Sequence, residues 1–147
     1  MAEISEQLTA EVTKDFQSGL HCSQVAFAYA ARKLGLDEVT AKKISAGFGG
    51  GMMNGERCGA VTGALMGLGL KYGHSSAEDK PNEAELLAKK AEFEKKFLEN
   101  YPSLQCKEIL GADIGTPEGM QRCKEENLTK NCPALTAYAC QILEELL

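Results

Sequence analysis

Three features that often narrow the class of a protein are missing from this sequence. No stretch alternates apolar and polar residues over the length of a β-strand, so no sheet is predicted. The longest apolar run, residues 60–70, holds 11 residues and three glycines, whereas a membrane-spanning helix needs about 20 residues, so no membrane insertion is expected. Acidic residues outnumber basic ones by 21 to 16, and the net charge of −5 makes a nucleic-acid partner unexpected.

The N-terminus also lacks a targeting signal. The first residues contain no basic region followed by an apolar stretch, which is the pattern of a secretory signal peptide. The predicted location is therefore cytoplasmic, where stable structural disulfides are uncommon. The chain nevertheless has six cysteines in 147 residues. In that compartment we expect cysteines to bind a metal, to react, or to be buried and inert, rather than to staple the fold.

Helical patterning extends along almost the whole chain. Apolar residues recur every three or four positions, and turn or capping residues separate the segments. Helices are predicted over residues 5–19, 22–34, 37–46, 58–72, 82–101 and 132–146, with short helices over 103–111 and from residue 116. We therefore predict an all-α fold, with one domain spanning residues 1–147 and built as a helical bundle of about five main helices plus short helices.

The helix predicted from Cys58 carries an unusual stripe of glycines. Gly59, Gly63 and Gly67 repeat every four residues, although each glycine costs a helix roughly 1 kcal/mol relative to alanine. The stripe indicates that another backbone packs closely there, or that the smooth surface makes room for a cofactor beside Cys58. A second glycine cluster, in residues 47–51, lacks the features of a phosphate-binding loop and is predicted to be a flexible connection.

Four of the six cysteines stand where a helix is predicted to begin. They are Cys22, Cys58, Cys106 and Cys132, and each follows a turn signal and precedes a helix-like apolar stretch. The first turn of a helix exposes unpaired N–H groups and the positive end of the helix dipole, both of which favour an anion. A thiol placed there is expected to ionise more easily, and the thiolate is both the redox nucleophile and the metal ligand. The arrangement therefore predicts sulfur chemistry.

The spacing of these four cysteines excludes several kinds of site. Consecutive members are 36, 48 and 26 residues apart, and no CxxC pair occurs. This argues against a zinc ribbon, a thioredoxin-like dithiol and an attached c-type haem. Helix N-termini at one end of a bundle can still meet in space. Four thiolates that meet would suit a tetrahedral zinc site or a [2Fe–2S] cluster, whereas two pairs would suit reversible disulfides.

Three further residues are weaker candidates. Cys140 lies inside the last predicted helix and is expected to be a small buried hydrophobe. Cys123 stands in a mostly polar stretch and is interpreted as an incidental thiol, whose two basic neighbours would lower its pKa somewhat. His21 is expected to be a surface residue, with a base, a proton carrier or a further ligand as the alternatives.

The segment around Cys58 resembles a known family. Residues 44–73 look like the centre of the C_GCAxxG_C_C family of proteins, named for redox activity, whose hallmark is one CGAxxG motif, here residues 58–63, with three further separated cysteines. The matching cysteines are Cys22, Cys106 and Cys132. The resemblance covers the chain from about Gly19 onwards and implies redox activity. A related helical domain is associated with a proposed iron–sulfur site, so the resemblance also implies an iron–sulfur cluster.

These features together predict a redox protein, either an oxidoreductase or an electron-transfer protein. Its predicted reactive and metal-binding residues are Cys22, Cys58, Cys106 and Cys132, and Gly59 is predicted to help bind the cofactor. A [2Fe–2S] cluster is the first expectation for that cofactor, with zinc as the alternative and reversible disulfides as the rival that needs no metal. A structural zinc module and a non-catalytic interaction domain are the alternative functions. The expected partner is an unidentified redox partner, and the centre lies either within one chain or across a homodimer.

Overall fold

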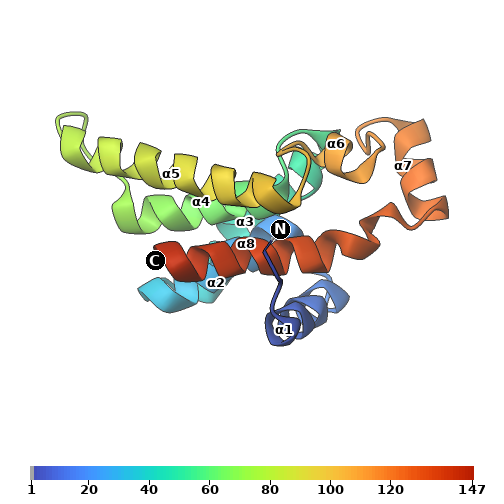
Figure 1. Ribbon diagram of the computed structural model, residues 1–147, viewed down its shortest axis with the longest axis horizontal. Helices are drawn as coiled ribbons and strands as arrows, with labels where there is room; N and C mark the ends of the chain where they lie inside the picture. The colour runs from blue at the N-terminus through green and yellow to red at the C-terminus, as the bar shows by residue number, and fades with distance from the viewer. Residues whose placement is uncertain (1) are drawn as a thin grey trace.

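The computed structural model describes residues 2–147 and is predominantly helical (Figure 1). Eight α-helices and no strand occur in these residues, which confirms the predicted all-α fold. The helices are α1 (Glu6–Gln17), α2 (Cys22–Leu34), α3 (Glu38–Ser45), α4 (Gly59–Tyr72), α5 (Lys80–Asn100), α6 (Cys106–Leu110), α7 (Pro117–Glu125) and α8 (Cys132–Leu146). Three single-turn segments connect some of them: η1 (Ala46–Phe48), η2 (Gly51–Gly55) and η3 (Leu128–Asn131).

Helix α4 is the central element of the core, and the glycine stripe explains why α2 packs directly onto it. A Cβ atom on Gly63 would lie less than 3.0 Å from the carbonyl oxygen of Ser23, and one on Gly67 would lie equally close to the Cβ of Ala30. The close approach predicted from the stripe is therefore confirmed at these two positions. Helices α5 and α8 also pack against α4, and α1 packs against α8 (Figure 1).

Aromatic side chains hold α5 against α8. Phe93 and Phe97 of α5 are fully buried, and the ring centroid of Phe97 lies 5.1 Å from that of Tyr101 and 6.3 Å from that of Tyr138. The Tyr138 hydroxyl donates a hydrogen bond of 2.7 Å to the carbonyl oxygen of Lys96, so its polar group is satisfied. Full burial of one phenylalanine side chain contributes about 1.5–3 kcal/mol. This layer therefore helps to fix α8 in place.

Two of the predicted helix starts are wrong. Helix α5 begins at Lys80 rather than Asn82, because the carboxylate of Asp79 caps it and accepts a hydrogen bond of 3.3 Å from the N–H of Asn82. Helix α6 begins at Cys106 with Gln105 as its N-cap, because the Ser103 hydroxyl instead accepts a hydrogen bond from the N–H of Gln105 in the preceding turn. The second correction makes Cys106 the first residue of its helix.

The glycine-rich connection between α3 and α4 has a defined left-handed conformation, where a flexible connection was predicted. Four consecutive residues, Gly50, Gly51, Met52 and Met53, have φ between 57° and 62°. Gly51 is needed there, because a Cβ atom would lie less than 3.0 Å from the backbone of Glu56. Each methionine adopts a conformation that costs an L-residue roughly 1–2 kcal/mol. The turn directs this segment towards the cavity described below.

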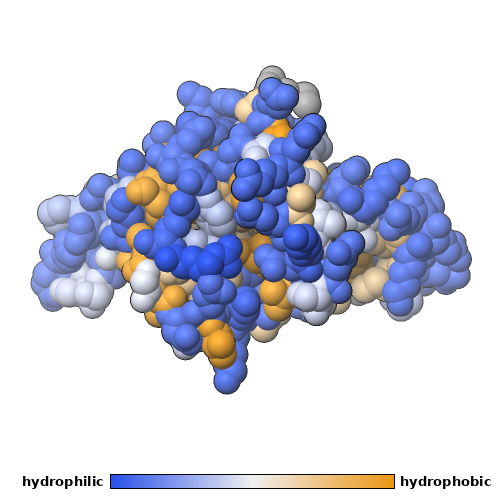
Figure 2. Space-filling view, turned by 90° about the horizontal axis from the view of Figure 1, so that it is seen from below, coloured by the Kyte–Doolittle hydropathy of each residue, from blue (hydrophilic) through white to orange (hydrophobic). Residues whose placement is uncertain are grey.

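No helix of residues 2–147 is both long enough and apolar enough to cross a membrane. The apolar residues of these helices are concentrated inside the bundle. The face of the molecule in Figure 2 is largely hydrophilic, with apolar residues in small separate groups. The large apolar side chains that are exposed are distributed over several elements, for example Val39 in α3, Leu70 in α4 and Leu87 in α5.

Candidate functional site

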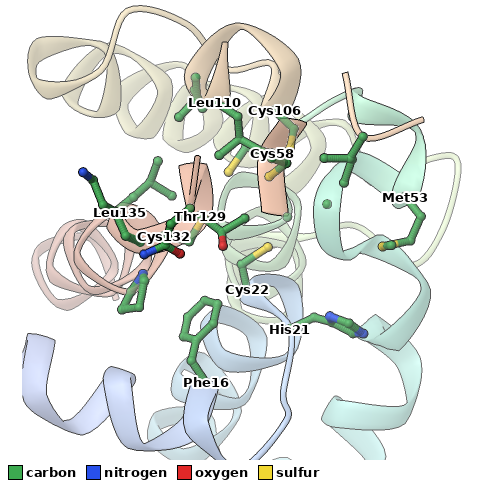
Figure 3. Close-up of a pocket in the computed structure, with 18 of the residues that line it drawn as sticks. Phe16, His21, Cys22, Met53, Cys58, Cys106, Leu110, Thr129, Cys132 and Leu135 are labelled. Atoms are coloured by element: carbon green, nitrogen blue, oxygen red, sulfur yellow. The ribbon is translucent and has the colours of Figure 1, made fainter. Parts of the chain in front are cut away.

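A cavity of about 720 Å³ lies at the end of the bundle where α2, α4, α6 and α8 begin. Five of the six cysteines line it: Cys22, Cys58, Cys106, Cys123 and Cys132. Figure 3 shows four of these side chains, Cys22, Cys58, Cys106 and Cys132, around one shared space, with Phe16 and Leu135 in its wall. The four cysteines singled out in the sequence are therefore brought together, although they belong to four different helix starts.

Each of these four cysteines lies at a helix start, as predicted, although α6 begins at Cys106 rather than after a cap at Ser103. Cys22, Cys106 and Cys132 are the first residues of α2, α6 and α8, and Cys58 is the N-cap of α4. The N–H groups of a first helical turn have no partner within the helix. At Cys22 and Cys58 such backbone N–H groups lie near the sulfur atom and favour its anionic form.

Two backbone hydrogen bonds bring the starts of α4 and α6 together. The N–H of Cys58 donates to the carbonyl oxygen of Leu104 at 2.8 Å, and the N–H of Cys106 donates to the carbonyl oxygen of Glu56 at 2.6 Å. The two segments form an isolated antiparallel bridge, the only such pairing in residues 2–147. Because the bridge joins the residues that immediately precede both helices, it positions Cys58 and Cys106 on neighbouring helix starts.

Gly59 makes room for the sulfur atom of Cys22. A Cβ atom on Gly59 would lie less than 3.0 Å from Cys22 Sγ, so a larger residue would displace the thiol. The backbone N–H groups of Gly50 and Ala60 lie within hydrogen-bonding reach of the Cys22 sulfur, and that of Ala60 is also within reach of Cys58. Cys22 and Cys58 therefore share the N-terminus of α4, with Gly59 between them.

The expectation that helix starts make these thiols acidic is wrong. Burial is the largest influence on all four and raises their pKa above the ordinary value of 9.0. It raises the pKa of Cys106 to about 11 and that of Cys132 to about 12. The N–H groups around Cys22 act in the opposite direction, but they lower its pKa by less than burial raises it. The loss of water around a thiolate thus outweighs the favourable helix start.

The cysteine side chains line the cavity without converging on a single point. No three histidine, cysteine, aspartate or glutamate side chains of residues 2–147 converge closely enough to hold a metal ion. A tetrahedral zinc site needs its sulfur ligands about 2.3 Å from one centre. The cysteines of the described chain are free thiols. The arrangement therefore offers a set of unpaired thiols distributed over one cavity wall.

Cys123 is a cavity residue that the sequence interpretation missed. Its side chain is 4% exposed, and its charge would raise the pKa of both Cys106 and Cys132, which places it near them. Its neighbours in the sequence are polar, so the sequence did not indicate that Cys123 is buried. In the structure those neighbours face solvent, and Cys123 is the buried residue of α7. The available signal was Met120, three positions earlier on the same helix, which also lines the cavity.

The remaining candidates, Cys140 and His21, lie in different parts of the molecule. Cys140 is fully buried in a cluster with Val12 and Val25, outside the cavity lining, as its place in an apolar helix predicted. His21 is the N-cap of α2, and its side chain contributes to the cavity wall near Met53 (Figure 3). The His21 side chain is exposed, as expected of a surface residue, and lies at the edge of the cavity.

The fold and the site together define an all-α bundle with a thiol-lined cavity at the helix starts. The sequence matches the family model described as "Putative redox-active protein (C_GCAxxG_C_C)" over residues 20–146, so the chain belongs to that family. The match includes all four helix-start cysteines and Gly59. Searches of curated proteins and of solved structures give no match.

Proposed function

We propose that this chain is a redox protein whose centre lies in the thiol-lined cavity, and that Cys22, Cys58, Cys106 and Cys132 hold a [2Fe–2S] cluster there for electron transfer. The observation that carries the proposal is the meeting of four thiols, from four helix starts, in the wall of one cavity. The family description supports redox activity in general. The choice of cofactor rests on the chemistry of the donors.

The donor set fits an iron–sulfur cluster better than a single metal ion. A [2Fe–2S] cluster takes four cysteine thiolates, two on each iron, so it needs two neighbouring pairs rather than four sulfur atoms around one point. The Cys22 sulfur and Cys58 lie together beside Gly59, at the start of α4, and Cys106 and Cys132 line the same cavity. A structural zinc ion would require a tighter convergence than the described residues have.

The protein residues have three tasks at such a centre. The thiols of the four cysteines would supply the ligands, and would bind a metal as thiolates despite their raised pKa. The N–H groups of Gly50 and Ala60 would donate towards sulfur, which would stabilise its negative charge and raise the reduction potential. Apolar side chains such as Leu135 limit the access of water. A bound cluster would supply one-electron transfer.

A second candidate is thiol–disulfide chemistry, which the proximity of Cys22 and Cys58 favours. In that reaction the two thiols lose two protons and two electrons as one S–S bond forms, and a disulfide or quinone acceptor takes up the electrons. The raised pKa of both thiols would make them slow nucleophiles near neutral pH. We therefore rank it second. Either reaction suits a reducing compartment such as the cytoplasm.

Anaerobic purification followed by metal, sulfide and thiol analysis tests the proposal. We expect about two irons and two inorganic sulfides per chain, with visible absorbance that bleaches on reduction. Cys58→Ser should abolish both signals, whereas the matched control Cys140→Ser, at a buried cysteine outside the cavity, should retain them. Size-exclusion chromatography of the loaded protein shows whether one chain or a homodimer carries the centre.

Three other results would overturn the cluster proposal. Loss of two thiols on oxidation without any iron would identify the disulfide mechanism. One zinc per chain, with unfolding on chelation and no redox response, would identify a structural zinc module. Unchanged thiols and no metal would leave an interaction domain with buried cysteines, in which Cys58→Ser lowers stability but not partner binding.

A further inference from the structure

The cavity is larger than its cysteines require. Its volume of about 720 Å³ lies within the range of about 300–1,000 Å³ that is typical of pockets for small organic molecules. A disulfide needs no cavity at all, and a four-thiolate cluster fills only the space between its ligands. A part of the volume therefore remains for another occupant beside the thiols.

Most of the remaining wall is apolar. The apolar side chains come from several segments of the chain and include Phe16, Leu20, Met53, Ile109, Leu110 and Leu135. Two methionines, Met53 and Met120, contribute flexible and polarisable side chains to the same wall. Such a surface favours an apolar molecular body, because transfer of that body out of water contributes about 25 cal/mol for each Å² buried.

The charged residues of the wall are all basic. Lys124 and Lys130 line the cavity, and no aspartate or glutamate of residues 2–147 does. This contrasts with the chain as a whole, which has an excess of five acidic residues. Lys124 and Lys130 are exposed, and neither forms an ion pair within residues 2–147. Their ammonium groups are therefore available to a ligand.

We propose that the cavity binds a small organic anion, with its apolar body against the wall and its acidic group at Lys124 and Lys130. The two lysines lie on the α7–η3 side of the cavity, whereas Cys22 and Cys58 lie at the starts of α2 and α4. A ligand with its charged end at the lysines would thus direct its other end towards Cys22 and Cys58. That the bound molecule reacts at the cysteines rests on the proposed redox function, whereas the binding itself does not.

Two fluorescent probes of similar shape test this proposal. One is the anion 8-anilinonaphthalene-1-sulfonate, and the other is the uncharged N-phenyl-1-naphthylamine. We expect the double variant Lys124→Glu/Lys130→Glu to weaken binding of the anion by about tenfold or more, because each attraction becomes a repulsion. Binding of the uncharged probe should change by less than about twofold, since its apolar contacts remain.

Two further variants make the test specific. Lys43→Glu/Lys95→Glu changes the net charge by the same amount at exposed lysines outside the cavity, and it should leave both affinities unchanged. Leu110→Trp fills the cavity, and it should weaken both probes. The lysine variants alter exposed side chains only, so they decide the question even where Leu110→Trp does not fold. Near-UV circular dichroism checks folding of every variant.

The proposal is overturned if the anion binds the Lys124→Glu/Lys130→Glu variant as tightly as the parent protein. It is equally overturned if folded Leu110→Trp keeps full affinity for both probes, because the probes then bind elsewhere. Titrations on protein with and without iron separate this result from the redox proposal. Charge-dependent binding by a protein that never contains iron would support the anion site and refute the cluster. A protein that contains iron but binds the anion without any dependence on Lys124 and Lys130 would support the cluster and refute the anion site.

Discussion

Replacement of Gly59 by alanine would introduce a methyl group less than 3.0 Å from Cys22 Sγ. Ordinary contacts of a Cβ atom begin at 3.4 Å, so the sulfur atom must withdraw by more than about 0.4 Å. Metal–ligand distances tolerate deviations of only about 0.2 Å. We therefore expect Gly59→Ala to lose most of its bound iron and its visible absorbance, although the position carries no metal ligand.

The expected effect of Gly59→Ala on stability is small. Alanine gains about 0.5–1 kcal/mol over glycine in a helix, whereas an overpacked methyl group costs about 1–3 kcal/mol. The thiol of Cys22 can rotate away, but the added Cβ would also lie 3.0 Å from the carbonyl oxygen of Phe48 and 3.1 Å from the Cα of Gly49, so a cost of about 1–2 kcal/mol applies. The free energy of unfolding should consequently fall by at most about 1.5 kcal/mol.

Two alanine substitutions in the same helix are matched controls. At Gly63 the added Cβ would meet the backbone oxygen of Ser23, which cannot rotate away, so we expect a loss of about 1–2 kcal/mol. At Gly69 it would meet nothing within 4 Å, so we expect a gain of about 0.5–1 kcal/mol. Both controls should keep their iron while folded.

Urea unfolding followed by far-UV circular dichroism measures the three stabilities, and iron per chain is measured on the same samples. Iron loading of Gly59→Ala equal to that of the parent would refute the role assigned to this glycine. The packing argument would fail if Gly63→Ala were as stable as Gly69→Ala. The two readouts thus separate a defect of the site from a defect of the fold.

Three other predictions concern the thiols and the left-handed turn. Cys123→Ser should retain iron that Cys58→Ser loses, because four thiolates complete the cluster without Cys123; equal loss in both variants would make Cys123 a ligand. Burial raises the pKa of Cys140 to about 12, so its stabilising contribution is complete below pH 9 and declines as the pH rises from 9 towards 12. Relative to Cys140→Ala, the parent should therefore lose up to about 1.4 kcal/mol between pH 9 and 10, and a constant difference in unfolding free energy would contradict this. Met52→Gly should raise the free energy of unfolding by about 1 kcal/mol, because glycine adopts the positive φ of this exposed residue without strain; a lower midpoint of urea unfolding would contradict this.

Much of the fold could be predicted from local signals. Capping and turn residues are read over four or five positions, so the starts of α2, α4 and α8 were found correctly. The start of α5 was misplaced because Asp79 and Asn82 are both good caps, and the choice between them depends on how the chain enters the helix. The glycine stripe predicted a close helix contact but not its partner, which is α2.

The candidate site could be predicted only in part. The sequence identified four cysteines at helix starts, because those starts depend on neighbouring residues. It assigned them the wrong direction of pKa change, since burial comes from segments far away in the chain. It also missed Cys123, whose neighbours in the sequence are polar and whose neighbours in space are thiols.

The sequence alone therefore determined where the helices lie, which thiols begin them and to which family the chain belongs. Helix periodicity, capping and motif spacing are mostly local properties, so a linear pattern records most of them, though not the choice between Asp79 and Asn82 as the cap of α5. Only the tertiary structure decided that these thiols share one cavity, that burial keeps them protonated and that Lys124 and Lys130 supply the charge in its wall. The burial of a thiol and the electrostatic effect of charged groups on it depend on distances in space. The spacing of residues along the chain does not specify those distances.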